Sequence, residues 1–119
     1  MTNSHHGTIE RREEANVSIV VLEGEHDLST AERLAAALDE ACAAAGSVVV
    51  DLTSVGFLDS SIVRALLTAR EGALGEEHGF ALVAPPTSFA SRVLTLVVGA
   101  AIPTYPDLDA AVASVSATR

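Results

Sequence analysis

The 119-residue chain contains no lysine and no tryptophan, and aromatic residues make up only 3% of it. Without lysine, a phosphate-binding loop of the G-x-x-x-x-G-K-[ST] type is excluded, because its lysine contacts the nucleotide phosphates. Scarce aromatic residues also disfavour nucleic-acid binding, in which bases stack on rings. Acidic residues outnumber arginines and give a net charge of -9, which repels phosphate backbones and anionic lipids. The composition therefore predicts no nucleic-acid partner and favours a protein partner with a basic surface.

Cysteine is almost absent, since Cys42 is the only one. A single cysteine excludes an internal disulfide, and we also expect no thiol-ligated zinc site, no other metal and no cofactor. Its alanine neighbours indicate a small buried side chain. No run approaches the roughly 18 apolar residues of a membrane span, and the N-terminus has no apolar signal core. The sequence therefore predicts a cytoplasmic protein with no membrane span.

The length corresponds to one domain over residues 1–119, with a disordered polar tail at residues 1–7. Short runs of β-branched or apolar residues predict strands near residues 8–14, 17–23, 47–52, 80–84 and 103–105. Helical spacing of apolar residues predicts helices near residues 30–45, 60–73, 88–97 and 108–116. We expect Gly24–Asp27 to turn the chain and Thr53–Gly56 to form a loop. Alternating strands and helices indicate an α/β domain with a four- to five-stranded mixed, largely parallel sheet and about four helices.

Several polar residues are placed to cap the predicted helices. Ser29 or Thr30 is expected to cap the first helix, and Asp107 the last. Asp59, Ser60 and Ser61 precede the second helix and allow two interpretations. One is capping alone, because aspartate and serine are preferred at helix starts. The other is that one serine accepts a phosphate.

The physical consequences of such a phosphate are definite. It adds about -1.5 to -2 charges, and the helix N-terminus stabilises a negative charge by roughly 0.3–1 kcal/mol. The carboxylate of Asp59 opposes this gain. We therefore expect phosphorylation to leave folding almost unchanged. A partner packed on the same spot would meet an unpaired charge that costs several kcal/mol, so the effect should fall on binding.

The residues form no convincing catalytic constellation. A serine nucleophile needs a base oriented by a third group, and no G-x-S-x-G turn surrounds either serine. The histidines fall in the predicted tail, a turn and a glycine-rich loop, at His5, His6, His26 and His78. We therefore expect the chain not to be an enzyme.

Two segments resemble a known family. Gly24–Leu28 is similar to the G-E-x-D-x segment of STAS domains, and Val49–Ser61 is similar to their central strand and D-S-S-G motif. Weaker matches follow in the expected order, so the resemblance covers Val17 to Ser116. A stand-alone domain of this length most resembles bacterial anti-sigma factor antagonists of the SpoIIAA type. The implied fold is a small α/β domain with helices covering one face of its sheet.

The resemblance also implies partner switching. An unphosphorylated antagonist of this type binds an anti-sigma factor, a GHKL-type serine kinase, and thereby frees a sigma factor. The kinase phosphorylates the first serine of the motif, here Ser60 with Ser61 as the alternative, and a PP2C-type phosphatase reverses the modification. ATP and Mg²⁺ belong to the kinase. The implied partner-binding residues are Asp27, Asp59, Ser60, Ser61 and Ile62.

Ile62 departs from the family pattern, which usually has glycine at this position. Glycine lets a partner backbone approach closely, whereas a branched side chain would block the approach or offer an apolar contact. The departure leaves open a non-phosphorylated STAS scaffold, or a ligand-sensing subunit of a signalling or lipid-transport assembly. A small-molecule or nucleotide-binding module is a third possibility.

Overall fold

Strands and helices alternate along the chain as the apolar runs predict. The structure is a computed structural model that describes residues 7–99 and 101–116. Its elements are, in order, β1 (Thr8–Glu14), β2 (Val17–His26), α1 (Leu28–Ala45), β3 (Ser47–Leu58), α2 (Ser60–Gly75), β4 (Phe80–Val83), α3 (Phe89–Val97), β5 (Thr104–Tyr105) and α4 (Leu108–Ser116). The strands form one sheet in the order β1-β2-β3-β4-β5. Only β1 is antiparallel to its neighbour among these described strands, so the predicted α/β fold with a mixed, largely parallel sheet is confirmed.

Two central strands are longer than the sequence predicts. The expected turn at Gly24–Asp27 and the expected loop at Thr53–Gly56 are wrong, because β2 continues to His26 and β3 to Leu58. The two extensions pair with each other, with His26 opposite Leu58. Each therefore supplies the backbone hydrogen-bond partners that the other's weak strand formers need. A register shift follows Gly24, whose φ of 89° suits the irregular backbone of a bulge.

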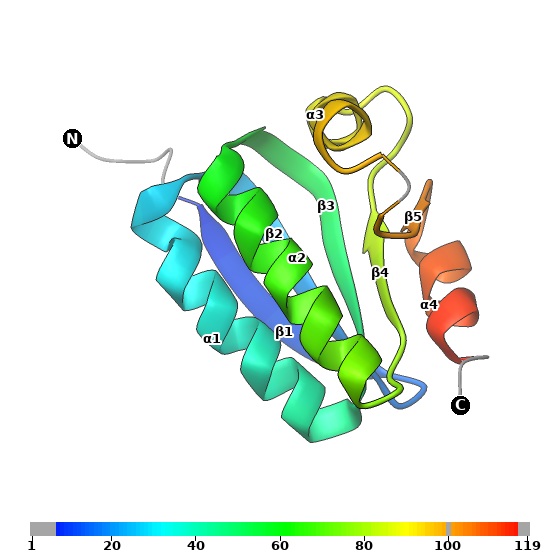
Figure 1. Cartoon of the computed structure of the whole chain (residues 1–119). Helices are drawn as coiled ribbons and strands as arrows, with labels where there is room; N and C mark the ends of the chain where they lie inside the picture. Colours follow the sequence, from blue (N-terminus) through cyan, green and yellow to red (C-terminus); the bar gives the residue numbers. More distant parts are fainter. Residues whose placement is uncertain (1–6, 100, 117–119) are drawn as a thin grey trace.

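The core lies on both faces of the sheet. Along β3, Val48 and Val50 pack in the larger cluster on the side of α1, α2 and α3, whereas Val49 points to the other face. There it packs with Ala111 and Val115 of α4. Figure 1 shows α1 and α2 side by side over one face of the sheet, with α4 apart from them beside β4 and β5. The resemblance implies one face covered by helices, and α4 covers part of the second face as well. The uninterrupted apolar run of β3 reflects this burial on both sides.

The start of the described chain packs against the end of β2. The sequence predicts that Gly7 belongs to a disordered tail, but the residue is buried. A Cβ atom at this position would lie 2.3 Å from Nε2 of His26, so only glycine fits this close approach. The rest of the predicted tail, residues 1–6, lies outside the described residues. Within residues 7–99 and 101–116, no helix combines the length and the apolar character needed to cross a membrane.

Candidate functional site

The candidate site lies at the carboxyl ends of β2 and β3. These neighbouring parallel strands end in register, because His26 pairs with Leu58. Asp27 and Asp59 come directly after them, and each is the N-cap of the helix that follows. The pairing therefore brings the starts of α1 and α2 to the same edge of the sheet. The sequence-predicted residues Asp27 and Asp59 are placed there together.

The two aspartates cap their helices with the same geometry. Oδ1 of Asp59 accepts hydrogen bonds from the backbone N–H of Ser61 at 2.9 Å and from its hydroxyl at 2.6 Å. Oδ1 of Asp27 accepts the equivalent bonds from Ser29, also at 2.9 and 2.6 Å. The expectation that Ser29 or Thr30 caps α1 is therefore wrong. In an Asp-x-Ser segment the carboxylate occupies the capping position, and the serine becomes a donor to it.

The structure distinguishes the two candidate serines. Ser60 is the first residue of α2 and is exposed. Its hydroxyl makes no hydrogen bond with any other residue that the structure describes. The Ser61 hydroxyl is half-buried and donates to Asp59. Of the two, the Ser60 oxygen is therefore the more accessible to an incoming phosphoryl group.

Ile62 lies away from this surface. Its side chain is 0% exposed and belongs to the larger core cluster, together with Leu66 one turn further along α2. Its backbone N–H still faces the cap, at 3.4 Å from Oδ1 of Asp59. The residue that departs from the family pattern is thus a core residue in this chain.

A groove of about 950 Å³ runs between α1 and α2 and begins at the candidate site. Its lining includes Leu28, Ser60 and Arg64 at this end. Arg64 is exposed and follows Ser60 by four residues, so their side chains are neighbours on the helix surface. Nothing in the motif marks Arg64, and its i, i+4 spacing from Ser60 is the one signal in the sequence that could have found it.

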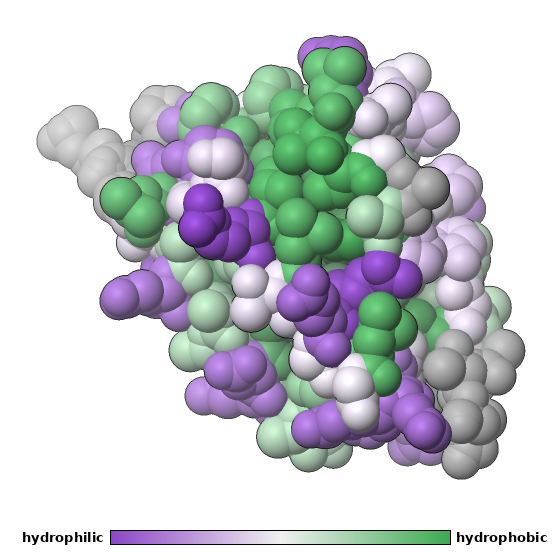
Figure 2. Space-filling model, viewed as in Figure 1, coloured by the Kyte–Doolittle hydropathy of each residue, from purple (hydrophilic) through white to green (hydrophobic). Residues whose placement is uncertain are grey.

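An apolar surface adjoins the same edge of the sheet. Exposed large side chains come from the end of β3 and from α3, with Phe57 42%, Leu96 85% and Val97 59% exposed. The ring of Phe57 lies 6.1 Å from that of Phe89, which joins the two elements. Figure 2 shows an apolar area over α3 and the adjacent end of β3, bordered by hydrophilic side chains. Surfaces of this kind commonly mark protein contacts.

His26 is a buried polar residue beneath the site. Its Nδ1 lies 3.0 Å from the Thr30 hydroxyl, and its Nε2 lies 3.1 Å from the carbonyl oxygen of Glu23. Because a carbonyl only accepts, Nε2 carries the proton. Burial lowers the pKa of His26, and hydrogen bonds to backbone carbonyls partly offset that effect. The sequence placed His26 in a turn, and only the strand pairing reveals its position.

Fold and site together define a small single-sheet α/β domain whose second crossover helix begins with an exposed serine. Residues 9–99 match the family model described as "Mlab, STAS domain". The chain belongs to the STAS domain family. A comparison with curated proteins gave no match.

Solved structures agree with this membership. An anti-sigma factor antagonist from Mycobacterium paratuberculosis is 30% identical, with a TM-score of 0.82 over 97% of this chain and 98% of that one. The phosphorylated form of SpoIIAA from Bacillus is 17% identical, with a TM-score of 0.71 over 91% of this chain and 99% of that one. A sulfate transporter family protein from Wolinella succinogenes is 20% identical, with a TM-score of 0.63 over 84% of each chain. The predicted resemblance to SpoIIAA-like anti-sigma factor antagonists is confirmed.

Proposed function

We propose that this chain is a cytoplasmic anti-sigma factor antagonist that switches partners by phosphorylation of Ser60. In the unphosphorylated state it binds a GHKL-type anti-sigma factor kinase and thereby releases a sigma factor. A PP2C-type phosphatase resets the switch. The chain itself catalyses nothing, because ATP and Mg²⁺ belong to the kinase.

The observation that carries this proposal is the difference between the two serine hydroxyls. Ser60 is exposed at the first position of α2, whereas the Ser61 hydroxyl is held 2.6 Å from Asp59. Phosphorylation of Ser61 would have to break that bond and place a dianion against the capping carboxylate. Ser61 therefore remains the less favourable acceptor.

A phosphate on Ser60 would meet opposing local charges. The helix N-terminus favours it, and the exposed guanidinium of Arg64 lies one turn away. Asp59 and Asp27 at the same edge oppose it. These contributions partly cancel, so the folded domain should tolerate the phosphate. The kinase would lose affinity, because the charge enters a surface that the complex covers.

The surroundings of Ser60 suit a protein partner. The exposed apolar side chains of Phe57, Leu96 and Val97 supply an area that a partner can bury. The net charge of -9 would steer a partner with a basic face toward the chain. The proposed contact surface contains Asp27, Asp59, Ser60 and these apolar residues, with Ser61 beneath, and it leaves out buried Ile62.

Phosphorylation by a purified cognate kinase, followed by mapping of the phosphate by mass spectrometry, tests the proposal. We expect one phosphate on Ser60, its loss in Ser60→Ala and its retention in the matched control Ser61→Ala. Ser60→Asp should weaken binding to the kinase by at least about 30-fold, since a buried unpaired charge costs more than about 2 kcal/mol. Phosphate on Ser61 alone, or on neither serine, would contradict the assignment.

A non-phosphorylated scaffold or ligand-sensing subunit of a signalling or lipid-transport assembly is the second candidate. The description of the matching family model names Mlab and a STAS domain and does not mention sigma-factor regulation. A sulfate transporter family protein also shares the fold. Binding of the partner that survives unchanged in Ser60→Asp would favour this function.

A further inference from the structure

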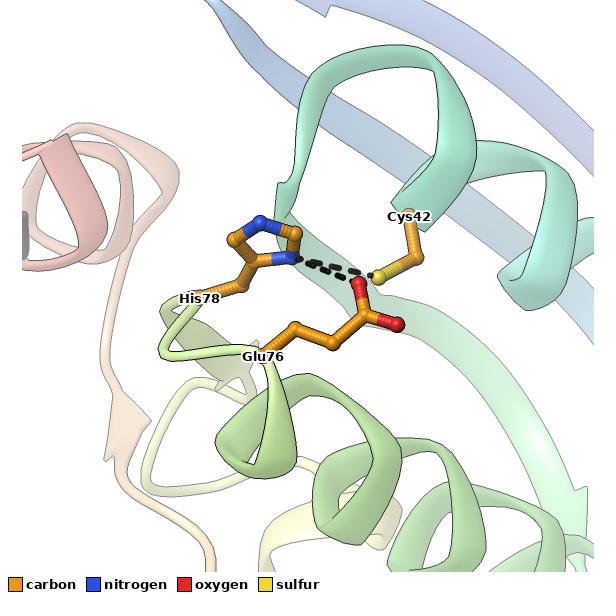
Figure 3. Close-up of side chains that lie close together, drawn as sticks. All are labelled: Cys42, Glu76 and His78. Carbon is orange, nitrogen blue, oxygen red and sulfur yellow. Dashed lines mark hydrogen bonds and ion pairs between the residues drawn. The ribbon is translucent and has the colours of Figure 1, made fainter.

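Three potential metal ligands meet at the far end of the groove from Ser60. Cys42 lies in the last turn of α1, and Glu76 and His78 lie in the segment that follows α2. Figure 3 shows the three side chains pointing toward one another across the gap between the two helix ends. The 16 residues of α2 separate this cluster from Ser60 by about 24 Å. The cluster therefore belongs to no part of the proposed phosphorylation switch.

The distances within the cluster resemble those between ligands of one metal ion. Sγ of Cys42 lies 3.6 Å from Nδ1 of His78, and Oε1 of Glu76 lies 3.7 Å from the same nitrogen. All three donor atoms lie within 4.8 Å of one another. With Zn–S near 2.3 Å and Zn–N near 2.05 Å, tetrahedral coordination places sulfur and nitrogen about 3.6 Å apart. The thiol and imidazole already have this spacing, and the exposed carboxylate needs only a small movement.

We propose that Cys42, Glu76 and His78 bind a Zn²⁺ ion, with the fourth coordination position open to water. Thiolate, imidazole and carboxylate are the three side-chain groups that zinc prefers. A single cysteine excludes only zinc sites that are built from several thiolates. Here the fold supplies the other two donors, Glu76 and His78, from a distant part of the sequence.

The backbone around the cluster holds two of the donors in place. The N–H of His78 donates to the carbonyl of Ala73 at 2.8 Å, which ties the segment to the end of α2. The His78 ring lies against Gly46, where an added Cβ would be 3.2 Å from Cδ2 and Nε2. Gly46 in turn donates its N–H to the Cys42 carbonyl at 2.8 Å. The end of α1 and the His78 ring are thus positioned against each other before any ion binds.

Negatively charged side chains gather around this position. Glu76 is one of the three potential ligands, and Asp39 lines the same groove as Cys42 and Glu76. Their carboxylates favour a cation there. Because zinc binds cysteine as the thiolate, binding would displace the thiol proton.

Titration of the full chain with Co²⁺ and Zn²⁺ tests the site. His5 and His6 are replaced by asparagine in every protein, so that the N-terminal imidazoles cannot bind the probe. We expect one equivalent of Co²⁺ to produce a thiolate-to-cobalt charge-transfer band, which Zn²⁺ then abolishes by displacement. Zn²⁺ should also raise the melting temperature.

Single substitutions identify the ligands. Cys42→Ser should abolish the charge-transfer band and the thermal shift, and His78→Gln and Glu76→Gln should each weaken Zn²⁺ binding by more than about tenfold. Glu77→Gln is the matched control, because it removes the same charge one residue away and should bind zinc normally. Ser60→Asp should also bind zinc normally, which separates this site from the proposed switch. Absence of the charge-transfer band would overturn the proposal. The proposal would also fail if Glu76→Gln and Glu77→Gln bound zinc equally well and His78→Gln bound it as tightly as the parent protein.

Discussion

Replacement of the α2 cap, Asp59→Ala, should destabilise the domain without touching the proposed phosphoacceptor. The substitution removes the acceptor for the Ser61 N–H at 2.9 Å and hydroxyl at 2.6 Å. Loss of an N-cap side chain costs about 1 kcal/mol, and loss of a negative charge at a helix start costs a further 0.3–1 kcal/mol at most. The expected loss is therefore about 1–2 kcal/mol. For a chain of 119 residues this corresponds to a fall in melting temperature of about 4–8 °C.

Thermal and urea denaturation followed by circular dichroism measure this loss. The matched control is Ser60→Ala, because it removes a neighbouring hydroxyl that makes no hydrogen bond with the described residues. Its stability should stay within about 0.5 kcal/mol of the parent protein. An Asp59→Ala melting temperature equal to that of the parent protein, or an equal loss of stability in Ser60→Ala, would refute the prediction. Either result would mean that the cap geometry does not distinguish the two positions.

Two further predictions concern buried residues beside the site. Because burial lowers the pKa of His26 below its usual 6.5, the unfolded chain binds the proton more readily, and stability should fall as the pH drops below 6.5. The free energy of unfolding should change by no more than about 1.4 kcal/mol per pH unit. Urea denaturation between about pH 5 and pH 7.5 measures this slope, which should be smaller in His26→Gln. Equal slopes in the two proteins would contradict the prediction. Ile62→Gly should cost about 3–5 kcal/mol, since it empties a fully buried core position and adds a helical glycine. The same change at exposed Arg64 should cost only about 1 kcal/mol, and similar losses at both positions in denaturation curves would refute the placement of Ile62.

The sequence predicts the alternation of elements well because apolar periodicity is a local signal. Two of its failures, the turn expected at residues 24–27 and the loop expected at residues 53–56, share one physical cause. Residues 24–26 and 53–56 contain weak strand formers, and they extend β2 and β3 only because each segment pairs with the other. Such pairing is a long-range event that local propensity does not encode. The buried position of His26 has the same origin.

The candidate site was predictable in part. Motif resemblance placed Asp27 and Asp59 at one face, and the strand register indeed brings the two helix starts to one edge of the sheet. The different surroundings of Ser60 and Ser61 were not predictable, because both serines suit a helix start equally well. The zinc cluster was hidden for another reason. Cys42 and His78 are 36 residues apart, and only the packing of two helix ends brings them together.

The departure at Ile62 has a different meaning once its position is known. Successive residues of a helix are rotated by about 100°, so Ile62 lies about 200° around α2 from Ser60. The outward direction of Ser60 therefore requires the Ile62 side chain to face inward, as its complete burial shows. An isoleucine in place of glycine fills the core beneath the helix and leaves the surface around the serine unobstructed. The substitution thus bears on the stability of the domain, and whether the chain is a switch depends on the chemistry of the Ser60 hydroxyl.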